Sequence, residues 1–150
     1  MTELVNTFAT SQERAEILRG LLRYRAALGS LGITGGFQLM DGSFVEECEK
    51  QRGRPPSDID LVTFAHRPTS DLGAWKALLA ANQQLFNPLV TKNSFRCDAY
   101  FVDLDIPPAK VVQQTFYWWG LFSHQKSTAL WKGVVVVNLA SDDAAAARLL

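Results

Sequence analysis

Two aspartates interrupt an otherwise apolar segment, residues 58–64 (DIDLVTF), near the middle of the chain. The alternation in this segment predicts a β-strand, in which Asp58, Asp60 and Val62 share one face. Aspartate is disfavoured in strands, so two of them in one apolar segment need a compensating partner. The segment therefore favours a fold whose sheet carries both carboxylates to a common site.

The remaining pattern predicts a single α/β or α+β domain over residues 1–150, with a mixed sheet of about four strands flanked by helices. The predicted helices cover residues 11–28, 44–50, 71–85, 107–123 and a short stretch from residue 141. The predicted strands cover residues 37–40, 58–64, 96–104 and 133–139. The last strand is rich in valine, and we expect it to be buried on both faces.

Composition excludes several classes of protein. Lys plus Arg and Asp plus Glu both number 15, and this balance argues against a nucleic-acid binder that depends on bulk positive charge, although not against a local basic groove. Cys48 and Cys97 are too few for a disulfide framework or a zinc site, which predicts reduced thiols. No signal peptide and no apolar run of bilayer length is visible. We therefore expect a cytoplasmic protein without membrane contact.

A glycine-serine turn precedes the aspartate strand. The predicted strand at residues 37–40 runs directly into Asp41-Gly42-Ser43, and a glycine there allows the backbone to approach an anion closely. Carboxylates two residues apart on a strand lie about 7 Å apart along it, and such oxygens suit hard divalent cations that also take phosphate oxygens. Together, the two segments predict a site for a nucleoside triphosphate held by a metal ion.

Gly42-Ser43, a short helix and then Asp58-Ile59-Asp60 resemble the signature of the nucleotidyltransferase superfamily, which has the DNA polymerase beta-like fold. The resemblance extends over roughly residues 37–139, and the stretch also resembles small, largely uncharacterised bacterial members of this superfamily. It implies the minimal nucleotidyltransferase fold and a third carboxylate on a later strand. Asp98, in the predicted strand at residues 96–104, is the natural candidate, and it shares a strand face with Tyr100.

The resemblance also implies an activity. Asp58, Asp60 and Asp98 would hold Mg²⁺ or Mn²⁺ and act in catalysis, while Gly42 and Ser43 would bind the phosphates of the nucleotide. The reaction would transfer a nucleotide from a nucleoside triphosphate, such as ATP, to a protein or RNA acceptor. Small proteins of this kind resemble members of toxin–antitoxin or phage-defence modules.

Basic residues near these motifs are candidates for binding phosphate. Lys126 and Lys132 flank the start of the last predicted strand, and Lys132 is the nucleotide-binding residue that we expect there. Arg52 and Arg54 lie in a proline-rich loop, where they would meet triphosphate or a polyanionic acceptor, although residues of such loops are usually only solvated. The two histidines have no metal-ligand spacing, and a surface or capping role is expected for both.

Two further alternatives stay open. Asp103 and Asp105, at the end of the third strand, are alternatives to Asp98. A helical stripe comprises Thr115, Trp118, Trp119 and Phe122. Core packing is the default for such a stripe, and a partner or homodimer face through Trp118, Trp119 and Phe122 is the alternative.

The small size of the chain bears on activity. Larger nucleotidyltransferases carry a further domain that grips base or acceptor, and little here lies beyond the core fold. The alternative function is therefore a catalytically inactive binding module with the same fold. The paired aspartates and the Gly-Ser turn favour the enzyme.

Overall fold

A mixed sheet in the order β3-β2-β1-β4 lies at the centre of the computed structural model, which describes residues 1–126 and 128–150. The strands are β1 (Gly36–Asp41), β2 (Ile59–Ala65), β3 (Cys97–Asp103) and β4 (Val135–Asn138). β1 is antiparallel to both β2 and β4, whereas β2 and β3 are parallel. The predicted α+β architecture with a four-stranded mixed sheet flanked by helices is confirmed.

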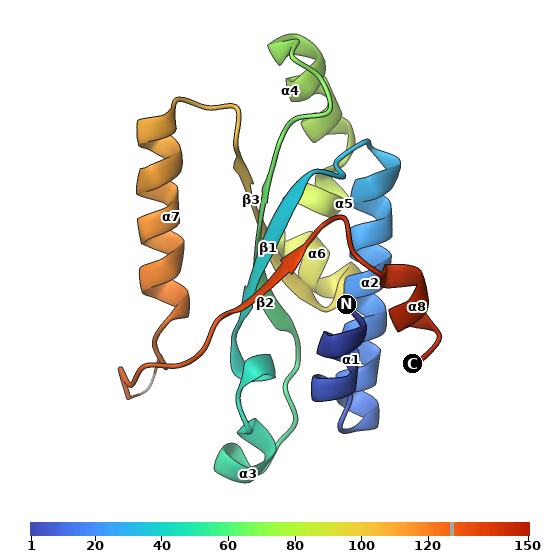
Figure 1. The fold of residues 1–150 in the computed structure, drawn as a ribbon, viewed down its shortest axis with the longest axis vertical. Coiled ribbons are helices and arrows are strands. Elements are labelled where there is room, and N and C mark those ends of the chain that lie inside the picture. The colour runs from blue at the N-terminus through green and yellow to red at the C-terminus, as the bar shows by residue number, and fades with distance from the viewer. Residues whose placement is uncertain (127) are drawn as a thin grey trace.

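Helices cover the two faces of the sheet unequally (Figure 1). One face carries α2 (Gln12–Ser30), α5 (Gln83–Phe86) and α6 (Pro88–Phe95), and α1 (Thr2–Phe8) and α8 (Asp143–Ala147) pack beside α2. On the other face α7 (Pro108–Phe122) is the one helix among the described residues. The connection from β1 to β2 contains η1 (Ser43–Val45) and α3 (Cys48–Arg52), and α4 (Leu72–Ala81) follows β2 at the opposite end.

The main core lies between the sheet and α2. Ser11 caps α2 by accepting a hydrogen bond from the Arg14 N–H, as expected for a helix that begins there. The fully buried side chains of this core come from one face of α2 and the matching face of the sheet, and include Ile17, Leu21, Tyr24, Met40 and Leu61. Apolar alternation in the strands therefore determines which sheet face α2 covers.

α7 is attached through a smaller cluster on the other face. Trp118 and Phe122 are 7% and 4% exposed and pack against strand residues, whereas Trp119 is 49% exposed. Successive helix residues point roughly 100° apart, so Trp119 cannot share the orientation of Trp118. The predicted partner face through Trp118, Trp119 and Phe122 is therefore wrong for Trp118 and Phe122, which belong to the core.

The segment between β2 and β3 differs from the prediction. The helix expected over residues 71–85 breaks at Asn82, which separates α4 from α5. The unpredicted α6 follows, with the Asn87 side chain accepting from the Leu89 N–H at 3.1 Å and Pro88 in the first turn. α6 packs against β3 and α2, and Lys92 in α6 lies beside the start of β2.

β4 also differs from the prediction, because it is not buried on both faces. It pairs with β1 alone in the described part of the chain and forms the edge of the sheet. Val136 is 56% exposed, while Val135 and Val137 pack against the main core. An edge strand with no helix over its outer face leaves every second side chain in solvent.

The two cysteines, Cys48 and Cys97, are free, in line with the predicted reduced thiols, and both are buried. Within residues 1–126 and 128–150, none of the helices has both the length and the apolar character that crossing a bilayer requires.

Candidate functional site

Three neighbouring strands place aspartates in a row. Asp41 is the register partner of Asp60, and Asp60 is the register partner of Asp98. Register partners point to the same face of a sheet, and adjacent strands are roughly 5 Å apart. With Asp58 immediately before β2, the structure brings together all three predicted carboxylates and adds Asp41, which the sequence pattern assigned to a turn.

Gly42 lies directly against Asp60. Its φ of +84° is in the region that favours glycine, and a Cβ at this position would lie 1.8 Å from Asp60 Oδ2. Ser43 follows as the first residue of η1. The predicted glycine-serine turn is therefore part of the same site as the Asp-x-Asp strand.

The carboxylates repel one another. Burial, as the largest cause, and the charges of Asp58, Asp98 and Asp41 together raise the pKa of Asp60 from its ordinary value of 3.8 to about 6, although the charge of Lys92 opposes them. Burial also raises the pKa of Asp41, although a hydrogen bond from Lys132 opposes this effect. The strand pairing therefore holds the carboxylates close together although their negative charges repel one another.

Two lysines supply countercharge. Lys92 forms an ion pair with Asp58, and Lys132 forms ion pairs with Asp41 at 2.9 Å and with Glu46 at 3.2 Å. The Lys132 side chain is only 11% exposed. Lys132, predicted to bind nucleotide, therefore lies beside the proposed phosphate turn but has its ammonium engaged by two carboxylates.

The compensation is incomplete. Asp41 Oδ1 is buried and has no hydrogen-bond partner among the described atoms, and Asp60 and Asp98 form no ion pair with any described side chain. No three His, Cys, Asp or Glu side chains of the described residues converge into a ready-made metal site. Asp41, Asp60 and Asp98 are therefore neighbours across the strands, but their side chains do not converge on one point. The carboxylate of Asp58 is paired with Lys92 instead.

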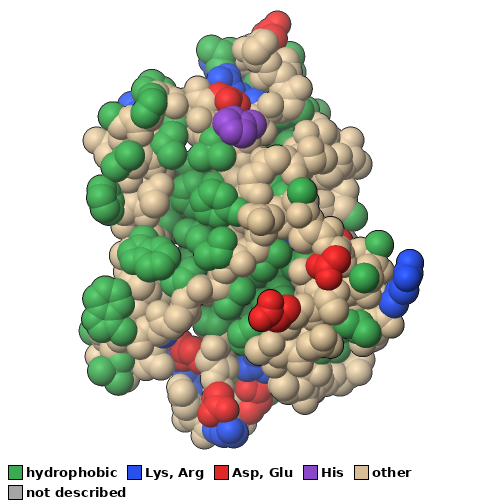
Figure 2. Space-filling model, viewed as in Figure 1, with side chains coloured by type: hydrophobic (Ala, Val, Ile, Leu, Met, Phe, Trp, Pro, Cys, Tyr) green, Lys and Arg blue, Asp and Glu red, His purple; other side chains and the backbone are tan. Residues whose placement is uncertain are grey.

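An open cleft of about 660 Å³ exposes the cluster to solvent. Its lining includes the carboxylates, the glycine-serine turn, the last three residues of α7 and residues 124–126 just after that helix. Arg52, Arg54 and Lys126, all suggested by the sequence, line it as well, although Arg52 is paired with Glu46 at 2.8 Å. Figure 2 shows acidic and basic side chains side by side at this lower end of the molecule, where α3 lies in Figure 1.

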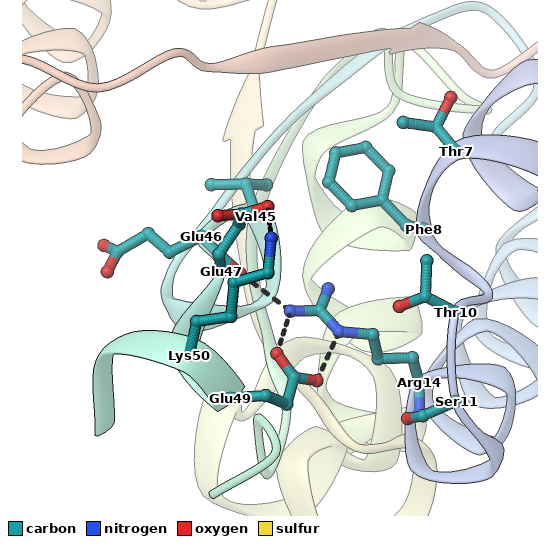
Figure 3. A pocket seen from close by; sticks show the side chains of 10 residues that line it. All are labelled: Thr7, Phe8, Thr10, Ser11, Arg14, Val45, Glu46, Glu47, Glu49 and Lys50. Atoms are coloured by element: carbon teal, nitrogen blue, oxygen red, sulfur yellow. Dashed lines mark hydrogen bonds and ion pairs between the residues drawn. The ribbon is translucent and has the colours of Figure 1, made fainter. Parts of the chain in front are cut away.

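Arg14 links α2 to the segment that follows the glycine-serine turn, and Figure 3 shows its guanidinium beside Glu49. It is buried, and its guanidinium donates to the Phe44 carbonyl at 2.6 Å, to the Glu46 carbonyl at 2.7 Å and to the Glu49 carboxylate. The hydrogen bond from Arg14 is the main reason that the pKa of Glu49 falls to about 2. The available signal in the sequence was a charged residue on the apolar face of α2, three positions before Ile17.

Several other predicted candidates lie outside the cluster. Asp103 and Asp105 are at the opposite end of β3, where Asp103 pairs with Arg67 at 3.3 Å and Asp105 with His66 at 2.7 Å. His124 lines the cleft, but its ring packs at a tilt against the ring of Trp131 rather than joining the carboxylates. The strand direction therefore excludes Asp103 and Asp105 as alternatives to Asp98.

Neither the comparison with curated proteins nor the comparison with solved structures finds a match to this chain. A family model does match, over residues 1–138, and this range includes the whole sheet, the turn and the residues that line the cleft. The chain belongs to that family, which is described as a family of unknown function (DUF6932).

Proposed function

We propose that this chain is a metal-dependent nucleotidyltransferase that transfers a nucleotide from a nucleoside triphosphate, such as ATP, to a protein or RNA acceptor. The main support is the strand register that sets Asp41, Asp60 and Asp98 side by side, with Gly42 against Asp60. The resemblance of the Gly-Ser and Asp-x-Asp segments to nucleotidyltransferases adds to it. A cytoplasmic location and a role in a toxin–antitoxin or phage-defence module rest on the sequence alone.

The donor chemistry of the site fits Mg²⁺ or Mn²⁺. Carboxylate oxygens are the ligands that these hard cations prefer, and the site offers several of them, while His124 in the same cleft packs against Trp131 instead. The pKa of Asp60 is raised, and Asp41 Oδ1 has no hydrogen-bond partner among the described atoms. Both observations support binding of a positively charged ligand at the cluster. Asp58, Asp60 and Asp98 would hold the ion once Asp58 is released from Lys92.

A bound divalent cation would neutralise triphosphate charge and lower the pKa of an attacking hydroxyl. In the chain itself, the Asp98 carboxylate forms no ion pair with any described side chain and would accept the proton of the acceptor hydroxyl as general base. The Gly42 backbone and the Ser43 hydroxyl would bind the terminal phosphates, which leave as pyrophosphate.

Positively charged groups around the cleft would complete the phosphate site. Arg54 and Lys126 are exposed on its rim and would attract the triphosphate and a polyanionic acceptor. Lys132 would act mainly through Asp41 and Glu46, by fixing the strand end that carries the turn.

A second candidate function is a non-catalytic binding module. The outer face of α7 exposes Phe116, Tyr117 and Trp119, which are 74%, 61% and 49% accessible, and Trp131 beyond the helix is 75% accessible. Exposed aromatic side chains of this kind are enriched at protein interfaces. In this function α7 would hold a partner protein or a second copy of the chain.

Transfer of a radiolabel from the α-phosphate of a nucleoside triphosphate distinguishes the nucleotidyltransferase from the binding module. The purified chain is incubated with labelled nucleoside triphosphates, Mg²⁺ or Mn²⁺ and candidate protein and RNA acceptors. We expect label on an acceptor with the wild-type chain and with Asp103→Asn, and none with Asp58→Asn/Asp60→Asn. Label transfer by the double variant would refute the assigned site, and neither transfer nor nucleotide binding by the wild type would favour the binding module.

A further inference from the structure

Lys92 reaches into the carboxylate cluster from α6, an element that does not otherwise line the cleft. Its ammonium pairs with Asp58, whose side chain is 10% exposed. We propose that Lys92 is a built-in counter-ion: it occupies the cation position at Asp58 in the metal-free protein and is displaced when a divalent metal binds. This inference rests on the proposed metal-dependent function and concerns what sets the metal affinity of the site.

The distribution of charge supports this role. Of the described basic side chains, Lys92 is the one that forms an ion pair with any of Asp58, Asp60 and Asp98. These same three carboxylates raise the pKa of Lys92, with the hydrogen bond to Asp58 as the largest cause. A single positive charge therefore faces three carboxylates, and a divalent ion would neutralise them better than an ammonium does.

The backbone below Lys92 is firmly held. Thr91 is fully buried, and its hydroxyl accepts a hydrogen bond from the Ala99 N–H of β3 at 3.3 Å and donates to the Pro88 carbonyl at 3.0 Å. The Lys92 carbonyl accepts from the Arg96 N–H at 3.0 Å. Displacement of the ammonium therefore needs no movement of α6, only of the side chain.

The side chain itself is free to leave. It is 47% exposed, and a lysine has a long flexible stem that can turn its ammonium into water. Lys132 is different, because it is 11% exposed and sits between Asp41 and Glu46. We therefore assign Lys132 as a permanent partner of the turn and Lys92 as the exchangeable cation.

Mn²⁺ binding to the full chain, followed by electron paramagnetic resonance, tests the inference. Removing the competing charge in Lys92→Gln should tighten Mn²⁺ binding by about tenfold or more. Lys76→Gln, an exposed site on α4, is the matched control and should bind as the wild type does. Metal-free Lys92→Gln should also melt at a lower temperature than the wild type, and Mn²⁺ should reverse this loss, because the metal replaces the missing charge.

A second measurement uses the unmodified protein. Acetylation of lysines, read by mass spectrometry, should increase at Lys92 when Mg²⁺ is added, since the released ammonium becomes accessible, and should not change at Lys76. Unchanged reactivity of Lys92 in the metal-bound protein would overturn the inference even if Lys92→Gln failed to fold.

The outcomes separate the two proposals. Equal or weaker Mn²⁺ binding by Lys92→Gln, compared with the wild type, would overturn the role of Lys92 and leave the metal site intact. No Mn²⁺ binding by either protein would overturn the metal-dependent function together with this inference. Tighter binding by Lys92→Gln without any nucleotide transfer would support the role of Lys92 and count against the catalytic function alone.

Discussion

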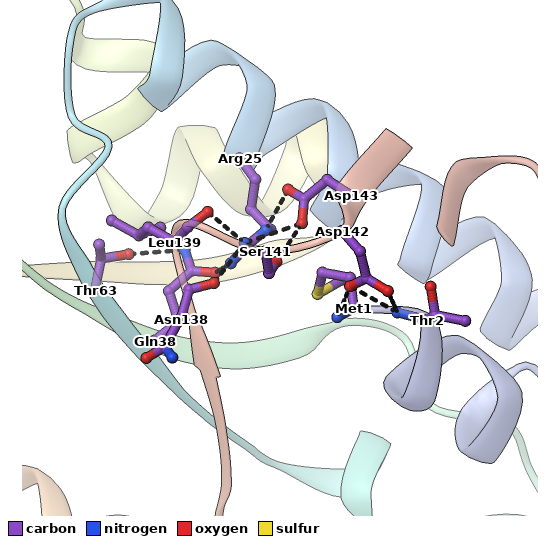
Figure 4. A network of polar contacts seen from close by, with 10 residues as sticks. All are labelled: Met1, Thr2, Arg25, Gln38, Thr63, Asn138, Leu139, Ser141, Asp142 and Asp143. Carbon is purple, nitrogen blue, oxygen red and sulfur yellow. Dashed lines mark hydrogen bonds and ion pairs between the residues drawn. The ribbon is translucent and has the colours of Figure 1, made fainter. Parts of the chain in front are cut away.

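Two clusters of charged side chains lie against the sheet, and they differ in how completely each charge is paired with a partner of opposite charge or a hydrogen bond. In the first, every nitrogen of the buried Arg25 guanidinium donates a hydrogen bond (Figure 4), to acceptors on Gln38, Asn138, Leu139, Ser141 and Asp143. In the second, the carboxylates of the cleft outnumber the cations that pair with them, and Asp41 Oδ1 has no described partner.

The difference separates a structural role from a binding role. A buried charge that is fully paired and hydrogen-bonded holds elements together, and Arg25 ties the end of β4 and the start of α8 to α2. A cluster of like charges opened to solvent by a cleft costs stability unless a ligand neutralises it. We therefore interpret the Arg25 cluster as scaffold and the aspartate cluster as a ligand site.

Removal of the fully hydrogen-bonded Arg25 guanidinium should give the largest change in the free energy of unfolding. Arg25→Met leaves the Asp143 carboxylate and the buried Gln38 amide without their partner, so the free energy of unfolding should fall by about 3–5 kcal/mol. Urea denaturation measures this loss. Arg19→Met, which removes an exposed pair with Glu16 on the same helix, should change stability by less than about 0.5 kcal/mol. Equal effects of the two variants would remove the contrast between the clusters.

A substitution in the aspartate cluster should have the opposite sign. Asp60→Asn removes a charge that burial and, to a smaller extent, the neighbouring carboxylates disfavour, so the metal-free protein should gain about 1–2 kcal/mol of stability near neutral pH. The gain should vanish at saturating Mg²⁺, which stabilises only the wild type. Asp103→Asn, which breaks a pair with Arg67 at the other end of the sheet, should bring no gain. A loss of stability in metal-free Asp60→Asn would contradict the assigned repulsion.

The difference in stability between the wild type and Asp60→Asn should depend on pH within a defined range. Because the pKa of Asp60 rises from 3.8 to about 6 on folding, the folded chain binds this proton more tightly than the unfolded chain does. Ionisation of Asp60 therefore removes stability as pH rises from about 4 through about 6. The advantage of Asp60→Asn over the wild type should be near zero below this window and constant above it. Urea denaturation of both proteins across the window checks this, and an advantage that does not vary with pH would exclude Asp60 as its source.

The smallest change in stability should come from substitution of Ser57, an uncharged residue beside the aspartate cluster. Ser57 donates a hydrogen bond to Asp58 Oδ1 at 2.8 Å from an exposed loop position. Ser57→Ala should cost no more than about 0.5–1 kcal/mol, because water can replace the hydroxyl. A larger loss, measured by thermal unfolding, would show that the hydroxyl rather than the charge of Lys92 holds Asp58 in place.

Local patterns in the sequence predicted the faces of the strands and therefore much of the site. The period of two along β2 and β3 assigned Asp58 and Asp60 to the face of Val62, and Asp98 to the face of Tyr100. The glycine-serine turn was identified from its residue types. These predictions succeeded because each depends on the backbone of one short segment.

The remaining parts of the site depend on contacts between segments distant in sequence. Strand register makes Asp41 a neighbour of Asp60, and no local pattern reports register. Lys92 was missed because α6 is a short helix with weak periodicity that begins at a proline. Its part in the site depends on the ion pair with Asp58, a residue distant in the sequence. Arg14 was missed for a related reason, since its partners on η1 and α3 are far along the chain.

Diffraction from crystals of the wild-type chain grown with Mn²⁺, recorded where manganese scatters anomalously, tests the central claim most directly. We predict an anomalous peak in the cleft at roughly 2 Å from oxygens of Asp60 and of Asp58 or Asp98, with the Lys92 ammonium turned away from Asp58. A cleft without a peak, with Lys92 still paired to Asp58 at saturating Mn²⁺, would contradict the account.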